Sequence, residues 1–179
     1  MYKLFSILLI FLATLSFTYA EMKCAPGKCG GGKCGSAMKI QGDKKVYKGN
    51  TARKAIDIVP RTYHCAECNM FVNDLDYAAE LVEADGTTYF FDDIGCLVRW
   101  MQKHPSKNAV AFVKSLDTHR WINAKKAWYT RTDSTPMRYG FGAHEMKRKG
   151  LISFEKMKHL MLLGQTLRDP AVKKSLLQP

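Results

Sequence analysis

The segment 76–103 constrains the fold most, because it joins a hairpin signal directly to a helical pattern. Asp85-Gly86 is typical of a tight hairpin turn, and Leu81 and Val82 lie in the apolar stretch before it. The run 87–91 after the turn is β-branched and aromatic, which predicts a strand. We therefore expect two antiparallel strands that lead straight into the next element.

That next element is predicted to be a helix. Asp92 or Asp93 can cap its first turn, and the helix is expected to run to about Lys103 because Pro105 stops it. Its apolar residues recur at the spacing of one helical face: Ile94, Leu97, Val98 and Met101. The segment as a whole is thus a β-β-α unit.

The second half of the chain repeats this order more weakly. The runs 109–113 and 127–130 are predicted strands, and 121–124 leads into the second of them. After a loop at 135–143, Ser153 can cap a helix that Gly164 closes. The apolar face of that helix consists of Phe154, Met157, Leu160 and Met161. Two small β-β-α(-β) modules packed as one globular unit are expected, which is an α+β fold.

The N-terminal end differs in kind from the rest. Residues 1–20 hold one charged residue, Lys3, in an apolar stretch that ends in small side chains, as a secretory signal peptide does. Cleavage is expected after Ala20, with an uncleaved membrane anchor as the alternative. Residues 21–61 are expected to be a flexible Cys/Gly-rich arm and a basic linker, with an edge strand at 55–59.

The globular domain is predicted at 62–164. Residues 165–179 are expected to form a loosely packed tail, because Asp169-Pro170 breaks regular structure. The signal peptide predicts a periplasmic location. Export argues against nucleic acid as the partner of a chain with a net charge of +12. That charge favours docking to an anionic membrane surface or an acidic partner protein, although a plain lysine-rich surface explains it equally well.

The strongest chemical motif is His64-Cys65-Ala66-Glu67-Cys68-Asn69-Met70. Thiolates and thioethers are soft donors that favour Cu(I), so we predict a copper site at Cys65, Cys68 and Met70. A structural zinc site would usually need a second ligand pair, to which His64, Cys96 or His144 could contribute. A structural or redox-active disulfide between Cys65 and Cys68 is the other alternative.

The other cysteines, Met137 and three of the histidines are weaker candidate ligands. Cys24, Cys29 and Cys34 lie in near repeats of Gly-Lys-Cys-Gly and are predicted to form an auxiliary copper-collecting arm, or else a tail of mixed disulfides. Met137 is a more distant candidate ligand, and a buried gap-filler is as good an interpretation. Cys96 is expected to be a half-buried free thiol. The spacing of His104, His119 and His159 indicates no site.

Several of these pieces occur together, in order, in one known family. They are Cys65-Ala66-Glu67-Cys68-Asn69-Met70-Phe71-Val72, Ala78-Ala79, Asp85-Gly86-Thr87, Phe90-Phe91-Asp92, Trp121-Ile122-Asn123-Ala124 and Pro136-Met137. Over about 63–154 the chain resembles NosL, the accessory protein of nitrous oxide reductase. The resemblance implies paired β-β-α-β modules and a periplasmic copper(I) chaperone for that enzyme. It also implies that Cys68 and Met70, with Cys65 beside them, and Met137 are the candidate ligands.

The chain departs from this family in its arm, its C-terminal extension and its lack of a lipid-attachment pattern. The client could therefore be another copper enzyme. The predicted function is to bind Cu(I) and pass it on to a copper-accepting enzyme, without catalytic turnover. A thiol–disulfide oxidoreductase acting through Cys65 and Cys68 is the alternative. A metal-stabilised interaction module is a third interpretation.

Overall fold

The computed structural model describes residues 44–178, which fold into two antiparallel sheets and three α-helices. The larger sheet has the strand order β1-β3-β2-β4-β5. Its strands are β1 (Val46–Tyr47), β2 (Ala79–Val82), β3 (Thr88–Phe91), β4 (Val110–Lys114) and β5 (Trp121–Asn123). The smaller sheet has the order β7-β6-β8, with β6 (Trp128–Tyr129), β7 (Ala143–His144) and β8 (Ile152–Ser153).

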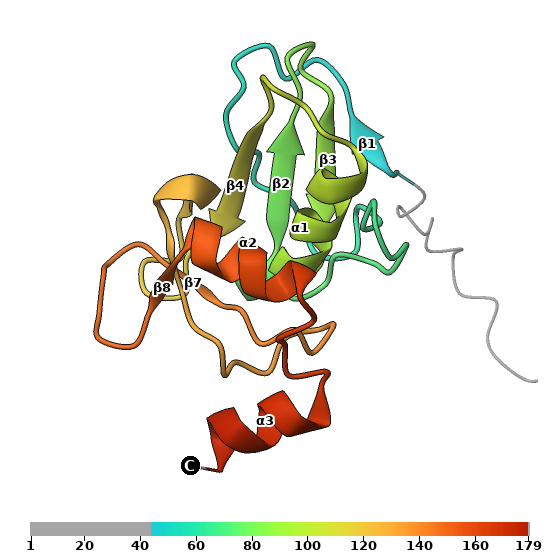
Figure 1. Ribbon diagram of the computed structural model, residues 1–179. Coiled ribbons are helices and arrows are strands. Elements are labelled where there is room, and N and C mark those ends of the chain that lie inside the picture. The colour runs from blue at the N-terminus through green and yellow to red at the C-terminus, as the bar shows by residue number, and fades with distance from the viewer. Residues whose placement is uncertain (1–43, 179) are drawn as a thin grey trace, which may run out of the picture. The chain divides into compact units, whose positions relative to one another are not determined.

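The helices are α1 (Ile94–Lys103), α2 (Phe154–Leu162) and α3 (Pro170–Leu177), and short 3-10 turns occur at Leu75–Tyr77 and Ala124–Lys126. α1 and α2 pack against each other, and α1 also packs on β2 and β3 (Figure 1). One β-β-α-β unit is thus formed by β2, β3, α1 and β4. The smaller sheet contacts α2 through β6 and β8. The predicted α+β fold is confirmed.

Both faces of the larger sheet are covered, because successive side chains of a strand point to opposite faces. Phe91 belongs to the main core with Leu81, Val113 and the inward residues of α1 and α2. Phe90 belongs to a smaller core on the other side, with Tyr63, Val72 and Ala78. The main core therefore lies between the sheet and the two helices, and the chain before β2 covers the opposite face.

The predicted turn and caps are present. Gly86 has a φ of +81°, the left-handed conformation that a glycine supplies at a hairpin turn. Asp93 is the N-cap of α1 and accepts a hydrogen bond from Gly95 N–H at 2.8 Å. Ser153 caps α2, and Gly164 follows its end with a φ of +74°. The strand–turn–strand–helix order of 76–103 is confirmed by these contacts.

Two predictions in the flanking segments were wrong. No strand lies at 55–59; the sheet edge is formed by β1, which pairs with β3, while Ile56 N–H bonds to the Glu80 carboxylate instead of a neighbouring strand. Asp169-Pro170 starts a helix rather than breaking one. Asp169 accepts hydrogen bonds from the backbone N–H groups of Ala171 and Val172, and proline is well suited to the first helical turn.

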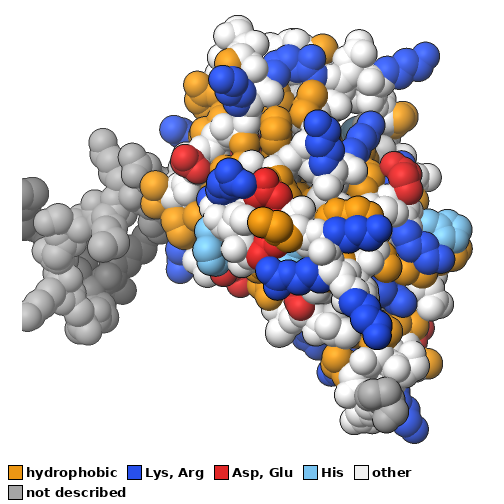
Figure 2. Space-filling view, turned by 90° about the vertical axis from the view of Figure 1, so that its left-hand side faces the viewer, with side chains coloured by type: hydrophobic (Ala, Val, Ile, Leu, Met, Phe, Trp, Pro, Cys, Tyr) orange, Lys and Arg blue, Asp and Glu red, His pale blue; other side chains and the backbone are white. Residues whose placement is uncertain are grey.

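The charge of this unit is visible on its surface. Figure 2 shows Lys and Arg side chains spread over one face, with acidic side chains interspersed among them. Within residues 44–178, no helix has both the length and the apolar character needed to cross a bilayer. The predicted signal peptide and the Cys/Gly-rich part of the predicted arm lie outside the described residues, whereas residues 44–61 of the predicted linker are described and contain β1.

Candidate metal centre

The turn that carries Cys65 and Cys68 is closed by its own backbone. Cys65 N–H bonds to Met70 O at 2.7 Å, and Asn69 N–H bonds back to Cys65 O at 2.9 Å. Asn69 has a φ of +63°, a left-handed conformation that asparagine tolerates better than most residues. Ala66 N–H bonds to Phe90 O at 2.9 Å and so attaches the turn to β3. The turn is thereby held beside the end of β3, and the thiols of Cys65 and Cys68 lie close together.

A second segment supplies two further donors close to these thiols. Asp92 follows the last residue of β3, and Cys96 lies in the first turn of α1. One ligand atom from each of Cys65, Cys68, Asp92 and Cys96 lies within 4.8 Å of the others. We call these four residues the cysteine cluster. Cys65, Asp92 and Cys96 are buried, and Cys68 is half-buried, so the cluster is reached from solvent through Cys68.

Protons in the cluster are distributed unevenly. Hydrogen bonds from Cys65 and Cys96, with a smaller contribution from Met70 N–H, lower the pKa of Cys68 to about 4. Hydrogen bonds with Cys65 and Cys68, together with burial, raise the pKa of Cys96. Burial raises the pKa of Asp92 to about 7. Cys68 Sγ and Asp92 Oδ1 are 3.2 Å apart, close enough to share a proton. A metal ion that bound here would displace the remaining thiol protons.

Glu67 fastens the turn to the helix that carries Cys96. Its Oε1 lies 2.9 Å from Arg99 Nε and 2.6 Å from Lys103 Nζ, and its side chain is only 7% exposed. Arg99 and Lys103 are three and seven residues beyond Cys96, so all three share one face of α1. These ion pairs also lower the pKa of Glu67 against the opposing effect of burial. The Glu67 clamp thus aligns Cys65 and Cys68 with Cys96.

The loop that contains Met137 is fixed to the start of α1. Asp93 Oδ2 accepts a hydrogen bond from Met137 N–H at 3.0 Å. A side chain at Gly95 would collide with the ring of Tyr139, so the loop can approach the helix this closely only because that position is glycine. The cap of α1 therefore organises both the cysteine cluster and the Met137 loop.

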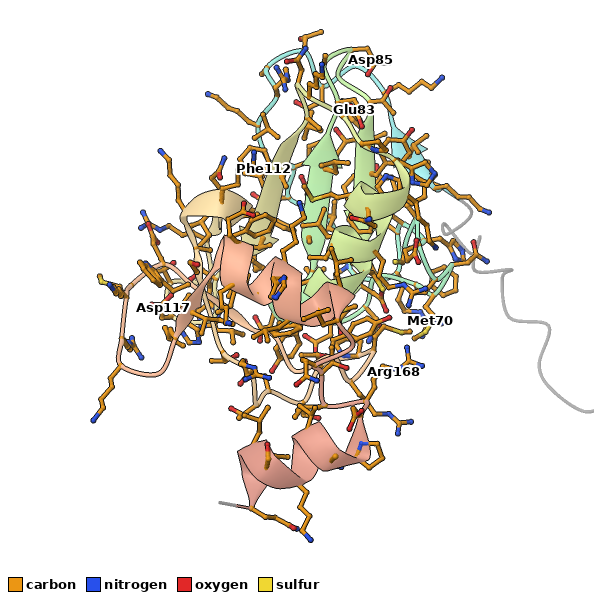
Figure 3. The ribbon with its side chains drawn as sticks, in the orientation of Figure 1. Met70, Glu83, Asp85, Phe112, Asp117 and Arg168 are labelled. Atoms are coloured by element: carbon orange, nitrogen blue, oxygen red, sulfur yellow. The ribbon has the colours of Figure 1, made fainter. Side chains whose placement is uncertain are left out.

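The two predicted methionine ligands, Met70 and Met137, line a common pocket. Met70 is 48% exposed and Met137 is half-buried, and both line an open pocket of about 680 Å³. We call this the methionine pocket; its lining includes Met70, Met137, Leu167, Arg138, Arg168 and Lys173. Met70 and Arg168 lie on the same side of the molecule in Figure 3. Of the four predicted ligands, Cys65 and Cys68 are brought together with Cys96 and Asp92, and Met70 with Met137.

Asp92 is not among the predicted ligands, and the predicted half-burial of Cys96 is wrong. Cys96 lies off the apolar stripe of α1, which suggested partial exposure, but the Cys65–Cys68 turn covers it and it is fully buried. Asp92 was considered only as a helix cap, a role that Asp93 fills. A usable signal was present: an acidic residue and a cysteine both lie within one helical turn of a strand–helix junction.

Neither candidate histidine joins the cluster. His64 Nδ1 lies 2.8 Å from Asn69 O and its ring packs on Phe71. His144 lies in β7, with its Nδ1 3.9 Å from Asp117. Cys24, Cys29 and Cys34 are outside the described residues. Within residues 44–178 the cysteine cluster is the one group of His, Cys, Asp and Glu side chains arranged to hold a metal ion.

Comparison with protein-family models, with curated proteins and with solved structures finds no match for this chain. The resemblance to the NosL family therefore stays a prediction, and the functional argument depends on the geometry of the cysteine cluster.

Proposed function

We propose that the protein binds Cu(I) at the cysteine cluster and passes it to a copper-accepting protein. The observation that carries the proposal is the convergence of three cysteine sulfurs and one carboxylate within 4.8 Å. The NosL-like motifs add a periplasmic setting and nitrous oxide reductase, or another copper enzyme, as the client. No turnover is required of the protein.

The composition of the cluster favours Cu(I) over a harder cation. Three of its four donors are sulfur, and soft thiolates select Cu(I) and zinc over magnesium or calcium. Structural zinc sites usually complete a tetrahedron with a fourth cysteine or a histidine, and this cluster contains neither. Asp92 has a different role: the Cys68 thiol donates a hydrogen bond to its carboxylate, which would accept the proton that copper displaces. Cys65, Cys68 and Cys96 would hold the ion.

The exposure of the cluster suits an ion that is carried and released. Cys68 is half-buried, whereas Cys65 and Cys96 are fully buried, so an incoming ligand reaches the ion from the Cys68 side. Exchange needs no oxidant. The incoming thiol loses its proton as its sulfur bonds to copper, the bond between copper and Cys68 Sγ breaks, and the released Cys68 thiolate accepts a proton. Copper stays in the +1 state throughout.

Anaerobic titration of the reduced chain with Cu(I) tests the proposal. The arm should first be silenced by Cys24→Ser, Cys29→Ser and Cys34→Ser, so that only the three cysteines of the cluster remain. We expect one Cu(I) per chain and loss of tight binding when Cys65→Ser and Cys68→Ser are added. Tight Cu(I) binding that survives these two changes, or binding of Zn²⁺ in preference to Cu(I), would overturn the proposal.

A thiol–disulfide oxidoreductase is the second candidate. It is favoured by the pairing of an accessible thiol, Cys68, with a buried one, Cys65, which could serve as attacking and resolving thiols. Cys96 lies within the same 4.8 Å and would compete for the disulfide. Exchange with oxidised glutathione, followed by mapping of the disulfide formed, tests this candidate. Rapid and reversible exchange confined to Cys65 and Cys68, without Cu(I) binding, would favour it.

A further inference from the structure

The methionine pocket is lined by cations on several sides. Arg138 projects from the Met137 loop, Arg168 precedes α3, and Lys173 lies within α3. All three side chains are exposed, and the pocket lining contains no acidic residue. Three positive charges around one concave, sulfur-containing surface create a local field that attracts anions.

These cations are largely unpaired in the part of the chain that the structure describes. The side chains of Arg138 and Lys173 make no hydrogen bond or ion pair there, and Arg168 contacts only Tyr139, with Nη1 3.3 Å from the hydroxyl. Two nearby carboxylates accept hydrogen bonds from other groups of the chain. Asp169 caps α3, and Asp133, which faces Arg138 and Lys173 from an adjoining groove, accepts a hydrogen bond from Thr130.

The pocket adjoins the cysteine cluster through its two methionines. Met70 O accepts a hydrogen bond from the backbone N–H of Cys65, a member of the cluster, at 2.7 Å. Met137 N–H donates to Asp93, the cap of the helix that carries Cys96. A molecule seated in the methionine pocket would therefore lie beside the side of the cluster through which an ion enters or leaves.

We propose that the methionine pocket is a docking surface for an acidic partner protein that exchanges copper with the cysteine cluster. The exchange of copper at this surface rests on the proposed function. The binding of an acidic partner can be tested without copper. Charge complementarity selects the occupant. The arm of this chain carries Lys23, Lys28 and Lys33, and a second copy carries the same net charge of +12, so both would be repelled.

The test uses copper-free, reduced full-length protein labelled with carbon-13 in its methionine methyl groups. Hexaglutamate serves as the acidic probe and hexaglutamine as the uncharged match. The variants Met70→Leu and Met137→Leu assign the two methyl resonances. Hexaglutamate should shift both resonances, and added salt should suppress the shift. Hexaglutamine should leave both resonances in place.

The matched variants separate the pocket from overall charge. Arg138→Gln with Lys173→Gln should weaken hexaglutamate binding by roughly 3- to 10-fold, because each exposed ion pair contributes little alone. Lys156→Gln with Lys158→Gln removes the same charge from α2, outside the pocket, and should have a smaller effect. Equal effects of the two pairs would overturn the proposal.

Other occupants would give other results. Anionic phospholipid vesicles that shift these methyls when hexaglutamate does not would assign the pocket to a membrane surface and overturn the proposal. Shifts that depend on protein concentration alone would assign it to a second copy, with the same consequence. Because copper is absent from every arm, a failure here is distinguishable from a failure of copper binding.

Discussion

The cysteine cluster and the methionine pocket share one short turn, yet they differ in burial, donor and charge. The cluster is enclosed, contains three thiols and a carboxylate, and is tied together by the Glu67 clamp. The pocket is open, contains two thioethers and is rimmed by cations. Enclosed thiolates suit tight retention of a soft ion, whereas an open cationic surface suits contact with a partner. Under the proposed function, retention and exchange of the ion therefore belong to neighbouring regions.

The largest expected effect is on the cluster side of this comparison. Cys96→Ser should lower the Cu(I) affinity of the arm-silenced chain by more than about 100-fold, since it removes a ligand rather than an outer contact. Met137→Leu should change the affinity by less than about 3-fold, because the side chain lies in the pocket. Competition with a Cu(I) chelator measures both. Equal losses would erase the distinction between the two regions.

Glu80 is a buried acid outside both regions, and its ionisation should make the stability of the fold depend on pH. Burial raises the pKa of Glu80 to about 8 from its ordinary value of 4.5, and Ile56 N–H is its hydrogen-bond donor. The folded state therefore binds a proton that the unfolded state has lost, and stability should fall as pH rises from about 4.5 to 8.

Glu80→Gln should reduce the pH dependence of the free energy of unfolding by about 1 kcal/mol per pH unit between about pH 4.5 and 8. Urea unfolding at several pH values measures it. The difference between the two proteins should be smallest at the acidic end, where Glu80 is neutral in both states. A difference that does not change with pH would contradict the assignment.

The joint between the two regions is Gly95. Gly95→Ala would push the Tyr139 ring away from the start of α1, at a cost of about 1 to 3 kcal/mol for overpacking a buried contact. Thermal unfolding measures the loss. The methyl resonance of Met137 should also shift, because its loop is attached to Asp93. A stable variant with an unchanged Met137 resonance would show that the loop and the helix are not coupled.

The smallest expected effect concerns the Glu67 clamp. Glu67→Gln should weaken Cu(I) binding by roughly 3- to 10-fold by loosening the turn against α1. In the parent chain the affinity should fall with added salt, and in the variant this dependence should be weaker. Glu155→Gln, an exposed change on α2, is the control. An unchanged affinity and salt response in Glu67→Gln would remove the clamp from the account.

The sequence predicted correctly those elements that are specified by residues close together in the chain. The hairpin at Asp85-Gly86 and the helix from Ile94 to Lys103 follow from turn chemistry, capping and periodicity within a few residues. The edge strand was misplaced because Glu80, far along the chain, takes the Ile56 N–H. The tail helix was missed because Asp169-Pro170 suits a helix start as well as a break.

Only the part of the candidate site that lies within one short segment could be predicted from the sequence. Cys65 and Cys68 are visible as a pair at short spacing, and soft-donor chemistry follows from their types. Cys96 joins them only because the turn docks on α1 through Glu67, and Asp92 only because β3 ends beside the turn. Periodicity describes one face of a helix and carries no information on what covers the other.

Copper K-edge X-ray absorption on the Cu(I)-loaded, arm-silenced chain tests the central claim most directly. We expect a first shell dominated by sulfur that loses sulfur in Cys96→Ser and is unchanged in Met137→Leu. A shell of nitrogen and oxygen, or a sulfur shell that Cys96→Ser leaves intact, would contradict it.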